Sequence, residues 1–468
     1  MLNLAEYRPH PHRLADRLPW AALVAPGVVL NKDGSFQRSL RFRGPDLDSA
    51  TESELVSVCA RLNGVLKSFG SGWALFFEAE RFAAPGYPAG NFPDPASWLV
   101  DAERRAAFES GQHFESAYHL TLLWLPPADP VRRAERALID GPKDEGRGAR
   151  DHLARFISDS DRVLGLLAGI LPELEALDDA ATLSYLHATI STRRHKVAVP
   201  AIPMYLDAVL VDSPLTGGLE PMLGDRHIRT LTVLGFPNLT RPGILDGLNH
   251  LGFEYRWVTR FLCLDKTEAT RTLTKLRRQW FAKRKSVAAL LREVLTNEPA
   301  PLIDTDAENK ATDADLALQA LGGDHVAFGH LTATVAVWDD TRQGAADKLR
   351  AVARVIEGCG FATISETVNA VEAWLGSLPG HVYANVRFIR HRHRQPVRRV
   401  RRARHRHPHI GRWPGAGEDQ RRRRLPPCHR RDRIRRPRHH RRLAHRHRLQ
   451  RGRLGMRTFW VRTTPTTR

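Results

Sequence analysis

Cysteine is scarce in this sequence. Its 468 residues contain 4 cysteines, at positions 59, 263, 359 and 428, and no two of them form a C-x-x-C pair. This usage argues against a disulfide-stapled secreted domain and against a zinc site. A protein of a reducing cytoplasm fits it best.

Long hydrophobic runs are also missing. A membrane-spanning helix needs about 18 or more apolar residues, and no segment reaches that length. The nearest candidate, residues 163–177, contains Pro172 and two glutamates. The apolar segment 18–30 is interrupted by Pro19 and Pro26, and no cleavage-site pattern follows it. We therefore expect a soluble protein, or one that binds a membrane only through partners.

Sequence signatures of nucleotide-binding and hydrolytic enzymes are absent too. The dipeptide Gly-Lys does not occur, so no G-x-x-x-x-G-K-[ST] phosphate loop exists in these 468 residues. No G-x-G-x-x-G follows a strand and opens a helix, and neither G-x-S-x-G nor H-E-x-x-H occurs. The sequence up to residue 387 thus carries no enzyme signature.

Lysine is missing from the last 81 residues. Residues 388–468 contain 29 arginines, 10 histidines and three acidic residues, a formal charge of +26. Residues 1–387 contain 43 basic and 48 acidic residues, a formal charge of −5. The overall charge of +21 therefore comes from the C-terminal segment, and the preceding 387 residues form a mildly acidic globular protein.

The C-terminal segment permits three interpretations, and in each it is a disordered, low-complexity tail. Arginine at this density attracts phosphate, so non-specific nucleic-acid binding in vitro is expected whatever its origin. Its His-x-His repeats could hold nickel or zinc loosely, but they lack a defined finger spacing. Arg, His, Pro, Gly and Ala are also what GC-rich coding DNA yields when it is read out of frame, because lysine codons are A-rich. A frameshift near residue 387 is the favoured interpretation, and a selected basic arm is the alternative.

Strand and helix patterns alternate throughout the first 387 residues. The apolar alternation around Asp33-Gly34 predicts a β-hairpin over 27–44, and the capping-box spacing of Thr51 and Glu54 predicts a helix that Gly70 ends. We expect an irregular insertion over 82–117. Further strands are expected at 73–80, 118–127, 206–212, 228–236, 253–264, 326–338 and 361–365. Further helices are expected at 151–177, 179–191, about 240–252, 267–297, 306–321, 341–358 and 366–376.

These elements predict an α+β fold with a mixed or mainly antiparallel sheet. We expect three parts, namely an α+β subdomain over 1–200, a second α+β subdomain over 201–387, and the tail over 388–468.

One helix carries the only concentrated basic face of the acidic region. Its cations are Lys275, Arg277, Arg278, Lys283, Arg284 and Lys285. A solvated structural face, a surface for a partner or for anionic lipid, and a nucleic-acid surface are all open interpretations.

Two weaker candidates are metal sites. Asp304, Asp306, Glu308 and Asp315 have the spacing of a calcium loop, but Asn309 replaces the glycine that makes the turn. An acidic start to a helix is the favoured interpretation, because carboxylates are stabilised near a helix N-terminus. The histidines at 119, 187, 227 and 325 are expected to be core or surface residues, so no metal ligand is predicted.

A family resemblance runs almost continuously over residues 1–387. Its most specific segments include "LTGGLEPMLGDRHIRTLTVLGFP" (215–237) and "LGFEYRWVTRFLCLDK" (251–266). The other segments that carry it are 18–51, 118–127, 183–194, 276–285, 304–329 and 369–387. In these segments the chain resembles the N-terminal region of the CagE/TrbE/VirB family of type IV secretion ATPases.

The resemblance implies a role in conjugative DNA transfer. Members of the family continue into a RecA-like NTPase domain that uses ATP and Mg²⁺, whereas here the resemblance stops at Arg387. We therefore expect a truncated family member with no RecA-like domain, no catalytic residues and no cofactor of its own. The resemblance implies contacts with inner-membrane components of the secretion channel and with neighbouring subunits in a homo-oligomer. It implies a cytoplasmic location, peripheral to the inner membrane. The alternative is a scaffold or DNA-tethering protein that uses a selected basic arm.

Overall fold

The computed structural model describes residues 13–45, 50–84, 86–109, 113–127, 145–237, 240, 242–284 and 305–385. Within these ranges no helix is both long enough and apolar enough to cross a membrane.

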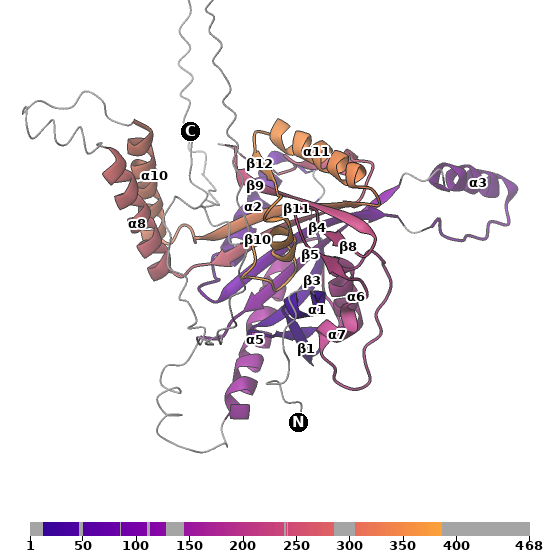
Figure 1. Ribbon diagram of the computed structural model, residues 1–468, viewed down its shortest axis with the longest axis horizontal. Helices are drawn as coiled ribbons and strands as arrows, with labels where there is room; N and C mark the ends of the chain where they lie inside the picture. The colour runs from indigo at the N-terminus through magenta and orange to yellow at the C-terminus, as the bar shows by residue number, and fades with distance from the viewer. Residues whose placement is uncertain are drawn as a thin grey trace, which may run out of the picture. The chain divides into compact units, whose positions relative to one another are not determined.

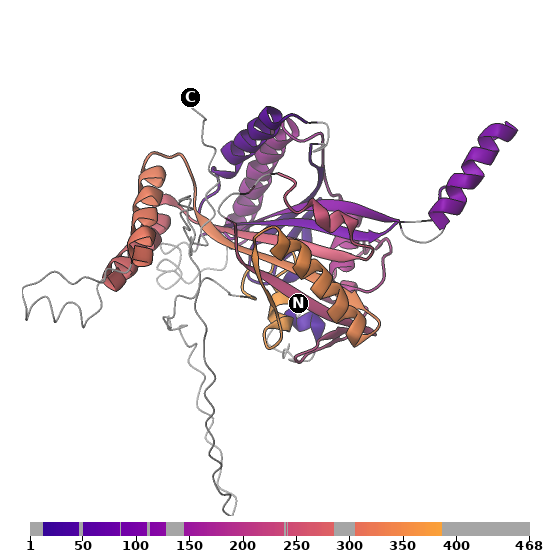
Figure 2. The same cartoon turned by 90° about the horizontal axis from the view of Figure 1, so that it is seen from above.

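One large antiparallel sheet forms the centre of the described region (Figures 1 and 2). Its strands are β1 Trp20–Ala25, β2 Val28–Asn31, β3 Phe36–Arg43, β4 Trp73–Ala83, β5 Phe114–Trp124, β6 Glu173–Ala176, β7 Leu215–Thr216, β8 Met222–Leu223, β9 Arg226–Gly235, β10 Tyr255–Cys263, β11 Gly329–Asp339 and β12 Ala362–Ser365. The order across the sheet is β1-β2-β3-β5-β4-β10-β11-β9-β8-β7, with β6 on β3 and β12 on β9. The α+β prediction with a mainly antiparallel sheet is confirmed.

The helices lie on both faces of this sheet. They are α1 Leu14–Arg17, α2 Glu52–Leu66, α3 Pro95–Glu109, α5 Glu145–Ala168, α6 Asp179–Ile190, α7 Leu206–Leu210, the 3₁₀ helix η2 Asp246–His250, α8 Lys266–Arg284, α10 Thr305–Gly322, α11 Arg342–Gly358 and α12 Ala370–Leu375. One face is apolar, and α2 and α5 cover one region of it while α11 covers another. On the opposite face, α1, α6, α7 and α12 share a second core around Trp20 and Leu186.

Local sequence signals explain the first elements. Gly34, at φ +86°, makes the turn between β2 and β3, and Asp33 accepts a hydrogen bond from the Ser35 amide. Thr51 and Glu54 form the expected capping box, and α2 ends at Leu66, before Gly70.

Several expected elements differ in the structure. Residues 82–117 are not simply irregular, because β4 runs to Ala83, α3 occupies 95–109 and β5 begins at Phe114. Asp94 explains the helix, since its carboxylate accepts the Ser97 amide at 2.9 Å. The expected helix over 151–177 ends at Ala168, and Glu173–Ala176 pair with β3 as β6 instead.

Two further corrections concern short segments. Residues 206–210 form a helix rather than a strand, because Leu206 and Leu210, four residues apart, both pack into the core beside α6. The helix expected over about 240–252 is reduced to η2.

Other expectations lie partly or wholly outside the described residues. Helix α8 ends at Arg284, and the expected continuation to 297 lies beyond the described range, as does the tail from 388. The boundary between residues 200 and 201 stays a prediction, although β4 and β10, from either side of it, pair within the same sheet.

Candidate functional site

One face of the sheet buries a line of polar side chains. In β4, Glu78 and Glu80 alternate with Phe77 and Ala79, so both carboxylates lie on this face. The strand register places other buried polar residues beside them, and we call the set the polar row. Its members are Ser39, Glu78, Glu80, His119, Thr121, Thr230, Thr232, Arg256, Arg260, Thr332 and Thr334.

A buried ion pair lies at the centre of the polar row. Nε of Arg256 donates to Oε1 of Glu78 at 2.6 Å, and Nη2 donates to Oε2 at 3.0 Å. The side chains are only 3% and 1% exposed, so desolvation opposes both charges. Burial alone would raise the pKa of Glu78, but the charge and hydrogen bonds of Arg256 lower it. The two-point geometry therefore keeps both groups charged.

Helix α6 closes over this ion pair. The hydroxyl of Tyr185 donates to Oε2 of Glu78 at 2.8 Å, and Arg256 donates to the carbonyl oxygen of Thr189 at 3.3 Å. The His119 ring stacks on the Tyr185 ring, with centroids 4.2 Å apart. Burial raises the pKa of Tyr185 and lowers that of His119 to about 4, so both rings are neutral at neutral pH.

The second carboxylate of β4 lies closer to solvent. Glu80 forms an ion pair with Arg194, whose guanidinium stacks over Phe82 at 3.9 Å from the ring centroid. Burial, together with the nearby charge of Glu78, raises the pKa of Glu80. The side chain of Arg194 remains 42% exposed, so this pair marks the edge of the buried site.

An open pocket of about 610 Å³ lies beside this edge, between α6 and the sheet. Its volume is within the range of ligand-binding pockets. We call it the α6 pocket. It is lined by Arg41, Glu80, Phe82, Ala117, His119, Leu177, Asp178, Ala180, Ala181, Ser184, Tyr185, Ala188, Arg194, His195 and Lys196.

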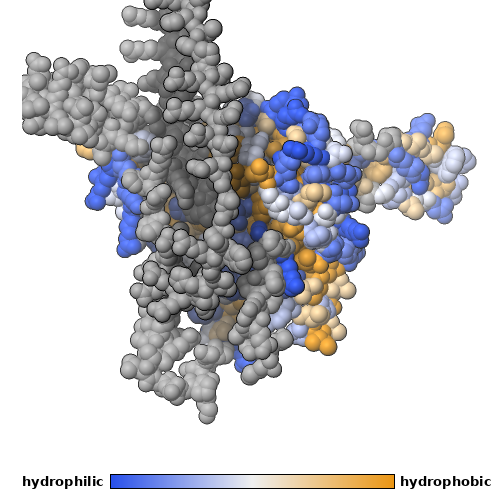
Figure 3. Space-filling view, viewed as in Figure 1, coloured by the Kyte–Doolittle hydropathy of each residue, from blue (hydrophilic) through white to orange (hydrophobic). Residues whose placement is uncertain are grey.

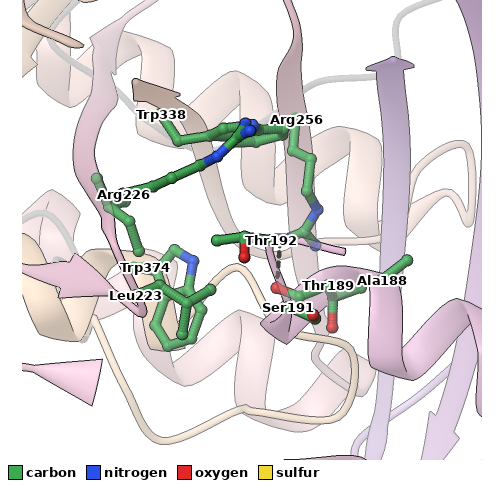
Figure 4. Close-up of a pocket in the computed structure, with 10 residues that line it drawn as sticks. Ala188, Thr189, Ser191, Thr192, Leu223, Arg226, Arg256, Trp338 and Trp374 are labelled. Carbon is green, nitrogen blue, oxygen red and sulfur yellow. Dashed lines mark hydrogen bonds between the residues drawn. The ribbon is translucent and has the colours of Figure 1, made fainter. Parts of the chain in front are cut away.

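A smaller cavity of about 30 Å³ lies past the C-terminal end of α6. Figure 4 shows Arg226, Trp338 and Trp374 around it, with Arg256 bonded to the end of α6. This volume has room for about two water molecules. It suits a hydration site rather than a substrate pocket.

Three residues near α6 have the side chains of a hydrolase triad but not its geometry. Nε2 of His187 lies 3.1 Å from Oδ2 of Asp212, and the Ser191 hydroxyl donates to the same oxygen at 2.7 Å. In a triad the histidine bridges serine and aspartate, whereas here the aspartate bridges the other two. Burial lowers the pKa of His187. The arrangement fixes the end of α6 and does not activate the serine.

The last described residues cross the polar row as an extended strap, residues 376–385. Arg260 donates to the carbonyl oxygens of His381, Ala384 and Asn385, at 2.9, 2.7 and 3.1 Å. The indole of Trp20 donates to the Pro379 oxygen at 2.8 Å. Burial lowers the pKa of Arg260 to about 10, so it remains charged at neutral pH and holds the strap electrostatically.

The predicted basic face lies away from this pocket, on α8. Lys275, Arg277 and Arg278 are exposed, and Arg277 bonds to Asp315 of α10 at 2.8 Å. Figures 1 and 2 show α8 and α10 side by side, and Leu273 packs between them with Ala317 and Leu321. Lys283 and Arg284 end α8, but the placement of their side chains is outside the description, and Lys285 lies beyond it. A role in binding stays a prediction.

The calcium-loop residues do not form a loop. Residues 305–322 are helical, and Asp315 pairs with Arg277, while Asp304 lies outside the described residues. No group of three or more His, Cys, Asp or Glu side chains is placed to hold a metal ion in the described ranges. His119 and His187 are buried and lie on different elements, β5 and α6.

The sequence interpretation missed the polar row and the α6 pocket. A signal was present, because "FFEAE" and "YHLTLLW" place polar residues at period two within strands that were interpreted simply as buried. The pairing of Glu78 with Arg256 was out of reach, since they lie 178 residues apart.

Comparison with known proteins follows the same segments. Residues 27–131 match the family profile "Type IV secretion system ATPase VirB4/TrbE, N-terminal domain". Residues 300–387 match "CagE, TrbE, VirB family, component of type IV transporter system".

Individual relatives extend the match. The chain is 32% identical over 406 residues to "Conjugal transfer protein TrbE" of Rhizobium radiobacter, which covers 83% of this chain and 49% of that protein. It is 41% identical over 131 residues to a probable conjugal transfer protein TrbE of Sinorhizobium fredii, covering 27% of this chain and 87% of that protein. It is 24% identical over 283 residues to "Type IV secretion system protein virB4" of Brucella melitensis, covering 56% of this chain and 34% of that protein.

The chain spans about half the length of the Rhizobium protein. Within that span, both profile matches and the relatives agree with the resemblance of the first 387 residues. The chain therefore belongs to the VirB4/TrbE family of type IV secretion system proteins.

Proposed function

We propose that this chain is a component of a type IV secretion system for conjugative DNA transfer, and that its described region docks on other components. The observation that carries the proposal is the match to a conjugal transfer protein over 83% of the chain. The partners are inner-membrane components of the channel and neighbouring copies of the chain. The location is cytoplasmic, at the surface of the inner membrane.

The geometry of the site supports docking better than catalysis. The central charges of the polar row, Glu78 and Arg256, are buried and paired with each other, which suits a rigid framework. Serine, histidine and aspartate near α6 are arranged to fix the chain rather than to react.

Exposed features on two helices support the same function. On α3, Trp98 and Leu99 are 59% and 56% exposed. Figure 3 shows hydrophobic residues among the polar ones on this helix. On α8, Lys275 and Arg278 present exposed cations. Aromatic anchors and a basic face suit contacts with a partner or with anionic lipid.

Co-purification from donor cells tests this function. A tagged chain is expressed in cells that carry the transfer apparatus, and its membrane and soluble fractions are compared. We expect the chain in the membrane fraction together with a channel component or a second copy. A chain that remains in the soluble fraction without any transfer component would overturn the proposal.

We also propose that the reading frame changes near codon 387. The family match ends at that residue, and lysine is absent from the 81 residues that follow. The DNA after codon 387, translated in the other two frames, is then expected to encode G-x-x-x-x-G-K-[ST] within roughly a hundred codons. Its absence from both frames would reject the frame change.

A second function, DNA tethering by a selected C-terminal arm, is favoured by the charge of +26 on residues 388–468. Tethering predicts DNA binding at about 0.15 M salt that disappears when these residues are deleted, because many phosphate contacts would then contribute. Binding that is lost between low and physiological salt would reject a selected arm.

A further inference from the structure

The α6 pocket combines small apolar walls with cations at its rim. Ala117 of β5 and Ala180, Ala181 and Ala188 of α6 contribute only methyl groups, which leaves the space open. The apolar walls can accept an apolar side chain of a ligand.

The charges around the pocket do not balance. Arg194 is neutralised by Glu80, and the carboxylate of Asp178 accepts the Ala181 amide at 2.7 Å. Arg41 and Lys196 are exposed, and neither makes an ion pair with another residue in the described ranges of the chain. These two cations therefore give the rim an unmatched positive charge.

A buried side chain at the pocket also lacks a partner. His119 is 8% exposed, lines the pocket, and its Nδ1 makes no hydrogen bond to any described residue. An unpaired buried nitrogen costs free energy unless a ligand or water pairs with it. The histidine thus supplies an independent sign that something polar binds here.

The form of the anion can be narrowed by the N-terminal end of α6. Asp178 already occupies the Ala181 amide, and Asp179 accepts the Gly27 amide at 2.7 Å. These carboxylates would lie near any phosphate placed at the helix end, and they occupy or repel where a phosphate needs free N–H groups. A single carboxylate placed toward Arg41 and Lys196 avoids that conflict.

We propose that the α6 pocket binds an acidic side chain of a partner polypeptide together with a neighbouring apolar side chain. The carboxylate pairs with Arg41 and Lys196, and the apolar group enters between the alanines of α6 and β5. This inference rests on the proposed function, because the acidic segment belongs to a docking partner.

Calorimetric titration of the full chain tests the proposal. The probes are acetyl-Phe-Glu-amide, the neutral acetyl-Phe-Gln-amide, and AMP as a source of phosphate. The variants are Arg41→Ala with Lys196→Ala, the pocket-filling Ala117→Phe, and the control Arg354→Ala, an exposed cation on α11. The arginine tail is identical in every variant, so differences between them report the pocket.

We expect the Glu peptide to bind more tightly than the Gln peptide at about 0.15 M salt. The double variant should weaken binding about fivefold, as expected for loss of exposed charge pairs. Ala117→Phe should abolish binding, and Arg354→Ala should change nothing. The rim residues are exposed, so the double variant tests the pocket even if Ala117→Phe does not fold.

Three results would overturn the proposal. They are equal affinity for the Glu and Gln peptides, no effect of the double variant, and tighter binding of AMP with the same dependence on Arg41 and Lys196. The last would assign the pocket to phosphate. If the chain co-purifies with a channel component but binds no acidic peptide, only this inference fails. If it binds the peptide but meets no transfer component, only the proposed function fails.

Discussion

At the scale of single residues, the Glu78–Arg256 pair is the most consequential contact. Each charge is almost fully buried and depends on the other, so the variant Glu78→Leu leaves Arg256 charged and unpaired. We expect it to lower the free energy of unfolding by about 3–5 kcal/mol in urea titrations. The exposed control Arg354→Ala should change it by less than about 0.5 kcal/mol. A loss below about 1 kcal/mol for Glu78→Leu would show that the pair is not central.

His119 makes stability depend on pH in a defined direction. Burial lowers its pKa from 6.5 to about 4, so between these values the unfolded chain binds a proton that the folded chain does not. The free energy of unfolding should therefore fall as pH drops from 6.5 to about 4. His381, whose pKa burial also lowers to about 4, adds to the same trend.

The variant His119→Phe isolates this contribution. It keeps a ring against Tyr185 but cannot be protonated, so we expect the loss of stability on acidification to shrink by up to about 3 kcal/mol. Urea titrations at neutral and acidic pH measure it. An unchanged pH dependence in the variant would mean that His119 is protonated in the folded state.

At the scale of elements, the strap is held by a close backbone approach. Gly380 has φ +87°, and a Cβ there would collide with the side-chain amide oxygen of Gln37. We expect Gly380→Ala to lower the free energy of unfolding by roughly 1–3 kcal/mol. Gly358, at the end of α11, faces open space, so Gly358→Ala should be neutral or slightly stabilising. Equal effects of both variants, measured by thermal unfolding, would contradict a tightly seated strap.

Elements with local signals could be predicted from the sequence, and elements decided by packing could not. The hairpin at Asp33-Gly34 and the capping box at Thr51 follow from residues a few positions apart. In α7, the choice between helix and strand depended on Leu206 and Leu210 packing into a core that distant segments complete. The α6 pocket was out of reach for the same reason, because β3, β4, β5 and α6 meet only in the folded chain.

At the scale of the whole molecule, composition divides the chain where the family match ends. Residues 1–387 carry −5 and contain every described element, while residues 388–468 carry +26. An isoelectric point near 10.6 therefore describes the tail rather than the folded region. The basic average favours nucleic acid as a partner, whereas the family and the α6 pocket favour a protein.

The central claim is that the described region docks on other components of the transfer apparatus. Its most direct test is photo-crosslinking in donor cells, with the reactive amino acid at position 196 on the rim of the α6 pocket and, as a control, at position 354 on α11. Mass spectrometry then identifies the captured proteins. We predict that position 196 captures a channel component or a second copy of the chain, that Ala117→Phe removes this capture, and that position 354 does not give it. Capture of no transfer component from position 196, or the same products from both positions, would contradict the claim.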